Sequence, residues 1–350
     1  MSCNLRRIFW RGFLIFSALF ILSACGGGGG SSSPSTGGGS TSSNTYSAGG
    51  MTYSGKTVQA AITNADSREV ISSLFSGATS GSALTALTVQ NNGISSQPWL
   101  LLIAKTIPGT VDQINFKTSS NSGDTVQKAS QSSSQTIYGN CGGSANVSLT
   151  ADSSNNTFSG TGTFSSYCMD GITINGSGSY SGSLNSQQLP QQFSFNTSNL
   201  NVEDGSITFN VAGTINFSLT WDSVPELTNL SATEDLLLKD STGNIYWIDN
   251  FNLGAVLKYA SGNLSELDLT LAGTFYDPVF GYVTVSTPSA FVFYSPWDYP
   301  SAGALTAVGA NNSSAILSVP SYGYADIKVD ADGDGIYEYD TGSIPWSSIQ

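Results

Sequence analysis

The residues best suited to chemistry are four acids near the end of the chain. Asp330, Asp332 and Asp334 alternate with small residues, a glycine occupies the sixth position of the run, and Glu338 the ninth. Alternate carboxylates, a glycine at a sharp turn and a carbonyl at the seventh position are the pattern of a calcium loop. Three converging carboxylates repel one another unless a cation lies between them. The spacing therefore predicts a structural Ca²⁺ site whose ligands are Asp330, Asp332, Asp334, Ile336 and Glu338.

The loop departs from an EF-hand at its twelfth position, which is Thr341 where a bidentate Glu is expected. The flanking segments 325–329 and 336–339 are typical of strands. The run resembles the DxDxDG loops found in β-hairpins of secreted bacterial proteins, which implies weak affinity of about 10⁻⁴ to 10⁻³ M. The alternative is an Asp-Gly hairpin turn that holds no metal.

Catalysis has few candidates. The chain contains no histidine, which excludes Ser-His-Asp, Cys-His and His-metal centres. A pair of carboxylates can still hydrolyse a glycosidic bond. Acids near the turns of a β protein are usually solvated, so we do not expect an enzyme and keep a polysaccharide hydrolase as an alternative. Its candidate acids are Asp249, Asp268, Asp277 and Asp298, which lie among Trp247, Phe251, Tyr276 and Trp297.

The first 24 residues have the order of a secretory signal. Three arginines precede an apolar run over residues 8–22, and Leu22-Ser23-Ala24 then leads to Cys25. The run is too short for a helix that spans a hydrocarbon core about 30 Å thick. We therefore expect residues 1–24 to be removed as a signal peptide.

Leu22 to Cys25 resembles the lipobox of bacterial lipoproteins. The resemblance implies that Cys25 becomes the first residue and carries acyl chains, palmitate among them, that anchor the protein in a membrane. The residue after the cysteine is Gly26, whereas Asp at that position would favour retention in the inner membrane. The resemblance therefore implies lipid attachment to the outer membrane, with the protein facing the periplasm or the surface. A plain signal peptide with an incidental cysteine is the alternative.

The charge is strongly acidic. Three of the 11 basic residues and none of the 24 acidic residues precede Cys25, which leaves a net charge of −16 for the mature chain. Such a polyanion is a poor partner for nucleic acid or for anionic headgroups. We therefore expect no nucleic-acid partner.

Two cysteines, Cys141 and Cys168, remain once Cys3 leaves with the signal and Cys25 is acylated. In an oxidising compartment such a pair is expected to form a disulfide. A metal pair is the weaker alternative, because the chain has no histidine and no other thiol to complete a zinc site.

The order of composition along the chain predicts four parts. Residues 25–50 are the lipidated cysteine and a flexible Gly/Ser-rich tether, and residues 51–134 are partly helical. Helices are predicted over 67–75 and 98–107, with a break at Pro108-Gly109 and a further helical piece from Val111 to Ile114. Residues 135–350 form a β domain.

The β domain is predicted from a change to a period of two. Apolar residues alternate with Thr, Ser and Asn over 172–184, 207–221 and 267–275, and short Gly-containing turns separate these runs. The fold class is therefore mainly β, an antiparallel meander that forms a sandwich or an open barrel, with a small N-terminal helical portion. A transmembrane barrel is disfavoured by the lipobox, by poor aromatic girdles and by a last residue, Gln350, that is not aromatic.

Several short motifs together resemble a loose group of bacterial lipoproteins to which no reaction is assigned. They are Ile62-Thr63-Asn64-Ala65, Cys141-Gly142-Gly143-Ser144, Tyr167-Cys168, Gly171 to Gly176, Gly309 to Ser314 and the closing Asp-Gly hairpin. We expect an outer-membrane-anchored lipoprotein with a binding or envelope-structural role and an envelope protein or polysaccharide as partner. A hydrolase and a carrier of an apolar ligand are the alternatives. Aromatic residues between 275 and 300 are expected to pack in the core or, alternatively, to form a binding face.

Overall fold

The computed structural model describes residues 45–65, 70–71, 99–112, 130–152, 154–169, 171–204, 207–223, 226–295 and 299–349. The proposed signal, Cys25 and most of the tether lie outside these residues. So do Trp297, Asp298, Ile114 and most of the predicted helix 67–75, of which only Val70 and Ile71 are described, as helical and buried. Among the described residues, no helix is long and apolar enough to cross a membrane.

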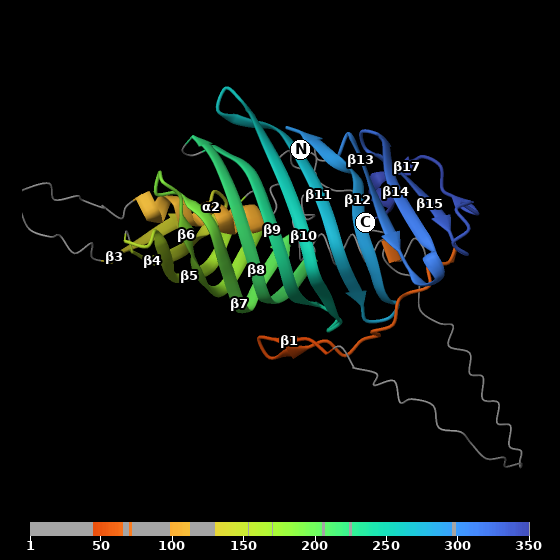
Figure 1. Ribbon diagram of the computed structural model, residues 1–350, viewed down its shortest axis with the longest axis horizontal. Helices are drawn as coiled ribbons and strands as arrows, with labels where there is room; N and C mark the ends of the chain where they lie inside the picture. The colour runs from red at the N-terminus through yellow and green to blue at the C-terminus, as the bar shows by residue number, and fades with distance from the viewer. Residues whose placement is uncertain are drawn as a thin grey trace, which may run out of the picture. The chain divides into compact units, whose positions relative to one another are not determined.

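A fifteen-stranded antiparallel sheet dominates the fold (Figure 1), so the mainly β prediction is confirmed. Strands β3 to β16 follow one another in space as they do in sequence, and β17 pairs with β15, as in a meander. The two end strands of this order, β3 and β16, do not pair with each other, so the sheet is open. The strands are β3 (Gln131–Tyr138), β4 (Gly142–Asp152), β5 (Thr157–Met169), β6 (Ile172–Leu184), β7 (Pro190–Asp204), β8 (Ile207–Ser223), β9 (Glu226–Asp240), β10 (Ile245–Ala260), β11 (Asn263–Asp277), β12 (Gly281–Tyr294), β13 (Ala302–Val308), β14 (Ser314–Ser321), β15 (Tyr324–Asp330), β16 (Tyr339–Asp340) and β17 (Ile344–Pro345).

The strands form where the sequence alternates. In β8 the side chains of Ile215, Phe217 and Leu219 are buried, whereas Asn216 and Ser218 between them are exposed. Successive residues of a strand point to opposite faces, so one face of the sheet packs on the core and the other meets solvent. We call these the inner face and the outer face. The three alternating runs predicted from the sequence correspond to β6, β8 and β11.

Helix α2 (Trp99–Asp112) packs on β3, β4 and β7 (Figure 1). The side chains of Trp99, Ile103 and Ile107 are fully buried in the main core. The prediction of a helix here is confirmed, but the predicted break at Pro108 is wrong, because the helix continues to Asp112.

Pro108 lies inside α2, and burial of the helix in the main core offsets its effect. A proline has no N–H to donate to the carbonyl four residues earlier, here Ala104. The Thr106 hydroxyl donates to the Ile103 carbonyl at 2.7 Å, and the Thr110 hydroxyl to the Thr106 carbonyl at 3.4 Å. Both bonds reach other carbonyls of the helix, and neither has the Ala104 carbonyl as its acceptor.

A short N-terminal segment crosses the outer face. Residues 45–53 form a hairpin, with strands β1 (Ser47–Ala48) and β2 (Met51–Thr52), that we call the strap. Tyr53 at its end is buried in a second small core with Leu237, Trp247 and Tyr276. Its hydroxyl donates to the Asp277 carbonyl at 2.9 Å. The strap therefore covers part of β9, β10 and β11 on the solvent side of the sheet.

The predicted disulfide between Cys141 and Cys168 is confirmed. It joins the turn before β4 to the end of β5, and the Cys141 N–H also donates to the Cys168 carbonyl. The bond closes a loop with a sequence separation of 27.

Candidate functional site

The four acids predicted from the sequence meet in the loop that joins β15 to β16. Asp330 ends β15 and is buried, whereas Asp332, Asp334 and Glu338 are exposed. One carboxylate oxygen from each lies within 4.8 Å of those of the other three. The cluster can therefore hold a metal ion. The position of the Ile336 carbonyl as a fifth ligand stays a prediction.

Asp330 organises the loop. Its two carboxylate oxygens accept the N–H groups of Gly333 at 2.7 Å and Gly335 at 2.9 Å. Glu338 closes the loop from the other end, because its Oε2 accepts the Ala331 N–H at 2.8 Å. These bonds hold Asp330 and Glu338 on one side of the turn.

Asp332 and Asp334 are oriented by the same means. The Asp332 carboxylate accepts the N–H of Asp334 at 3.2 Å, and the Asp334 carboxylate accepts the N–H of Ile336 at 2.7 Å. In each of these two bonds a single carboxylate oxygen accepts. Carboxylate oxygens are the ligands that hard divalent cations prefer.

Gly333 fits the loop against its neighbour. Its φ is +79°, and a Cβ there would lie 2.3 Å from the carbonyl oxygen of Asn311. No other residue type fits without a shift of the backbone, because both the torsion and the space require glycine. The Asn311-Asn312 motif and the acidic loop, singled out separately in the sequence, are thus in contact.

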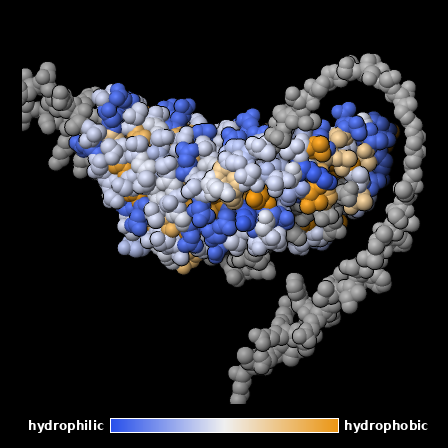
Figure 2. Space-filling view, turned by 90° about the horizontal axis from the view of Figure 1, so that it is seen from below, coloured by the Kyte–Doolittle hydropathy of each residue, from blue (hydrophilic) through white to orange (hydrophobic). Residues whose placement is uncertain are grey.

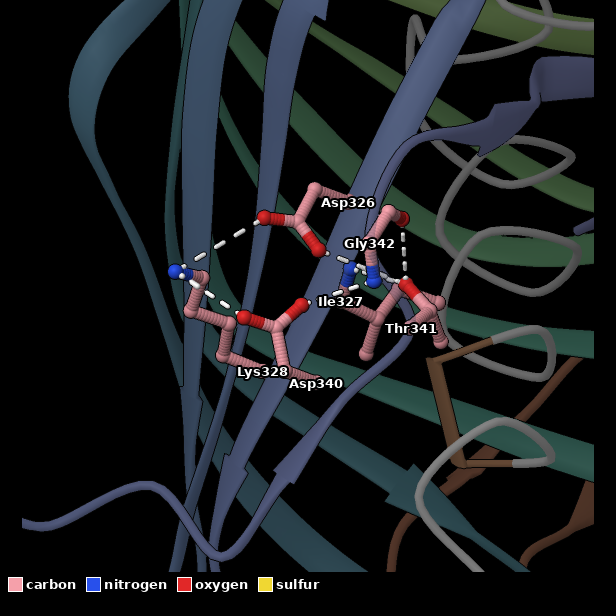
Figure 3. A network of polar contacts seen from close by, with 6 residues as sticks. All are labelled: Asp326, Ile327, Lys328, Asp340, Thr341 and Gly342. Atoms are coloured by element: carbon pink, nitrogen blue, oxygen red, sulfur yellow. Dashed lines mark hydrogen bonds and ion pairs between the residues drawn. The ribbon is translucent and has the colours of Figure 1, made fainter.

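A polar network joins β15 to β16 and to the residues that follow β16 (Figure 3). The Lys328 ammonium lies 3.3 Å from Asp340 and 3.9 Å from Asp326. Thr341 pairs with Ile327 twice, since its N–H donates to the Ile327 carbonyl and its hydroxyl accepts the Ile327 N–H. The network fixes β16 on β15 and so fixes both ends of the acidic loop.

The pKa values of the two acids in this network, Asp326 and Asp340, are shifted in opposite directions. The N–H of Gly342, at 2.7 Å, is the first cause that lowers the pKa of Asp340, and Asp326 and Lys328 lower it further. Burial raises the pKa of Asp326, and the neighbouring Asp340 adds to the rise. As the pH falls, Asp326 therefore takes up a proton before Asp340.

Two of the predicted hydrolytic acids, Asp268 and Asp277, make an ion pair or hydrogen bonds within the fold. Asp268 lies 2.9 Å from the Lys258 ammonium. One oxygen of Asp277 accepts the N–H groups of Val279 at 2.7 Å and Phe280 at 3.0 Å. Both acids therefore have structural contacts.

Asp249 has a different environment. Burial raises its pKa, and the charge of nearby Asp235 adds to the rise. The Asp235 carboxylate accepts the N–H of Asn250 at 2.9 Å, and the Asp235 carbonyl accepts the hydroxyl of Tyr46 from the strap at 3.1 Å. The strap therefore reaches the edge of this acidic pair.

The aromatic residues between 275 and 300 are divided between the two faces. Phe291 and Phe293 are buried in the main core, as predicted. Tyr276 stacks on Trp247 on the outer face, with ring centroids 4.1 Å apart. Tyr46 of the strap also stacks on Trp247, with ring centroids 5.6 Å apart. The outer-face group is covered by the strap, which the local sequence pattern did not indicate.

A groove of about 510 Å³ lies on the outer face of β5–β9. Its lining is mainly Ser, Thr, Asn and Gln, together with one glycine and two phenylalanines. Ser and Thr, whose hydropathy is intermediate, contribute to the pale surface that predominates in Figure 2, which separate blue and orange patches interrupt. The groove was not predicted from the sequence, although the polar residues of the alternating strands were its signal.

Comparisons of the chain with protein-family models, with curated proteins and with solved structures found no match.

One buried acid was also missed. Glu234 of β9 is fully buried on the inner face, between Ile215 of β8 and Phe251 of β10. Within the part of the chain that the structure describes, neither of its carboxylate oxygens has a hydrogen-bond partner. Burial raises its pKa well above the usual value, and Asp235 adds to the rise.

Proposed function

We propose that the protein is a lipoprotein anchored to the bacterial outer membrane through acylated Cys25, and that its β domain acts by binding an envelope component. The signal-like residues 1–24, the Leu22 to Cys25 motif and the Gly/Ser-rich tether support the anchor. The disulfide supports an oxidising compartment.

The observation that carries the binding role is the outer-face groove. It is a concave site of about 510 Å³ built from side chains of adjacent strands, within the size range of ligand sites. A groove that is polar and open to solvent does not suit an apolar ligand, so the groove favours binding over the carrier alternative.

We further propose that the ion of the acidic loop is Ca²⁺, with a structural role. The ligand set is all oxygen, and Ca²⁺ accepts more varied coordination geometries than the smaller Mg²⁺, which requires near-ideal octahedral geometry. Bound Ca²⁺ would offset two of the four negative charges of these carboxylates and hold the last hairpin on β15. An affinity of about 10⁻⁴ to 10⁻³ M fits extracellular calcium modules.

The anchor is tested by labelling bacteria with a palmitate analogue and separating their membranes. The wild-type chain should carry the label and sediment with the outer membrane, whereas the Cys25→Ser variant should lose both properties. Cys3→Ser is the matched control, since Cys3 lies within the proposed signal, and it should behave as the wild type. Label on the Cys25→Ser variant would reject the anchor.

One observation favours the second candidate function, a polysaccharide hydrolase. Asp249 has a raised pKa beside Asp235, and two carboxylates in unlike environments are the requirement for acid catalysis of glycoside hydrolysis. The test is release of reducing sugar from envelope polysaccharide by the wild type and by Asp249→Asn. Release that needs Asp249 would support the hydrolase and displace a purely binding role.

A further inference from the structure

The groove on the outer face is built as two parallel rows. The strand register places Ser183, Gln192, Ser218 and Ser231 side by side on β6, β7, β8 and β9. All four contribute to the lining of the groove, and the last three are exposed. A row of this kind offers one hydroxyl or amide group per strand.

The second row lies two residues away along each strand. It consists of Ser181, Ser194, Asn216 and Thr233, again in direct register. Residues two apart on a strand are separated by about 7 Å, and neighbouring strands by about 4.8 Å. The groove is therefore a grid of hydrogen-bonding groups with two fixed spacings.

Side-chain hydrogen bonds orient part of the grid before any ligand binds. Ser194 donates its hydroxyl proton to the Oδ1 of Asn216, and Thr233 donates to the Oδ1 of Asn252 at 2.9 Å. An amide whose oxygen is held in this way presents its NH₂ donors in a fixed direction. Groups ordered in advance lose less entropy on binding.

The lining carries no charged side chain, although the chain as a whole has a net charge of −13. An ionic ligand finds no opposite charge on such a surface, and burying its charge there without one would be unfavourable. An uncharged ligand rich in hydroxyl groups matches both the donors and the acceptors of the grid. The neutrality of the groove is thus complementary to a neutral glycan.

We propose that this groove binds an uncharged, extended glycan chain that runs across β6, β7, β8 and β9. An extended glycan advances per sugar ring by a length close to the strand spacing, so successive rings meet equivalent pairs of groups. The proposal rests on the binding role proposed above and names the ligand class of that surface.

The test is affinity electrophoresis of the full chain in gels that contain dextran, galactomannan or hydroxyethyl cellulose, with polygalacturonate as the anionic comparison. We expect at least one neutral polymer to retard the wild type. Asn216→Asp puts a charge in the groove and Ser218→Tyr fills it, and each should weaken retardation at least about tenfold. Asn210→Asp is the matched control, because Asn210 is also on β8 and accepts a hydrogen bond from Asn201, outside the groove.

Three results would overturn the proposal: no retardation by any neutral polymer, retardation by polygalacturonate alone, or equal retardation of the wild type, Asn216→Asp and Ser218→Tyr. Loss of binding in the Asn210→Asp control as well would also count against the groove as the site. None of these outcomes depends on Cys25, so failure of the glycan site and failure of the anchor are distinguishable.

Discussion

Replacing Glu234 by glutamine should remove a loss of stability that develops as the pH rises. The side chain is fully buried between Ile215 and Phe251, and burial raises its pKa well above the usual value. In the unfolded chain the same group ionises near its ordinary pKa of about 4.3. Below that pH both states bind the proton, and the group contributes no pH dependence.

Above about pH 4.3 the unfolded chain releases this proton while the folded protein keeps it, so ionisation favours the unfolded state. With one proton of difference, the free energy of unfolding falls by about 1.36 kcal/mol per pH unit, until the pH reaches the raised pKa of the folded state. Beyond that point the folded state ionises as well, and the curve levels off. The pH of the bend therefore measures the folded-state pKa.

The assay is urea unfolding at steps of about one pH unit from about pH 4 to pH 9, for the wild type, Glu234→Gln and Glu234→Leu. Subtracting each variant from the wild type cancels the titrating groups that do not interact with Glu234. Both variants have an uncharged side chain at position 234, so their difference curves, the unfolding free energy of the wild type minus that of the variant, should have the same slope against pH. Glu234→Leu should in addition gain about 1–3 kcal/mol, because it removes two buried oxygens that lack partners. Difference curves that are flat across this range would refute a buried, protonated Glu234.

Three further predictions concern the loop, the disulfide and the strap. About 10 mM Ca²⁺ should raise the unfolding free energy by roughly 1.4–2.7 kcal/mol for the affinity proposed, and Asp332→Asn should reduce this gain; a wild-type thermal unfolding curve that calcium leaves unchanged would exclude the ion. The double variant Cys141→Ser/Cys168→Ser should lose about 3.5 kcal/mol in urea unfolding, from the entropy of the loop that the bond closes, and an unchanged midpoint would contradict this. Gly49→Ala should expose the strap to limited proteolysis, because the new Cβ would lie 1.9 Å from a main-chain oxygen of β7. The control is Gly50→Ala in the same turn, where the new Cβ would enter open space. Equal cleavage of the two variants would show that the strap does not dock there.

The sheet was predictable because its signal is local. In β6, β8 and β11 every second side chain is apolar, and this alternation requires only that one face be buried. The acidic loop was predictable for the same reason, since its four acids and its glycine lie within nine consecutive residues. Their hydrogen bonds to the loop's own N–H groups depend on no distant part of the chain.

The contacts that sequence patterns did not predict join distant residues. Tyr46 stacks on Trp247 about 200 residues later, and nothing within residues 45–53 indicates that they cross the outer face. The Asp235–Asp249 pair depends on how β9 and β10 align, and a register shift between Ile248 and Phe251 sets that alignment. The helical prediction failed at Pro108 because packing of the buried helix outweighed the local preference of proline.

For Glu234, the alternation of apolar and polar residues predicts the face of the sheet but not the contacts of the side chain. Leu230, Ala232 and Leu236 mark the inner face of β9, so period two alone places residue 234 on that face. The pattern does not say whether a carboxylate there finds a partner, since partners come from β8 and β10. Those strands present Ile215 and Phe251, neither of which can donate a hydrogen bond from its side chain. The neutral form is therefore the state that this position tolerates, and the titration above tests the register of three strands together with one pKa.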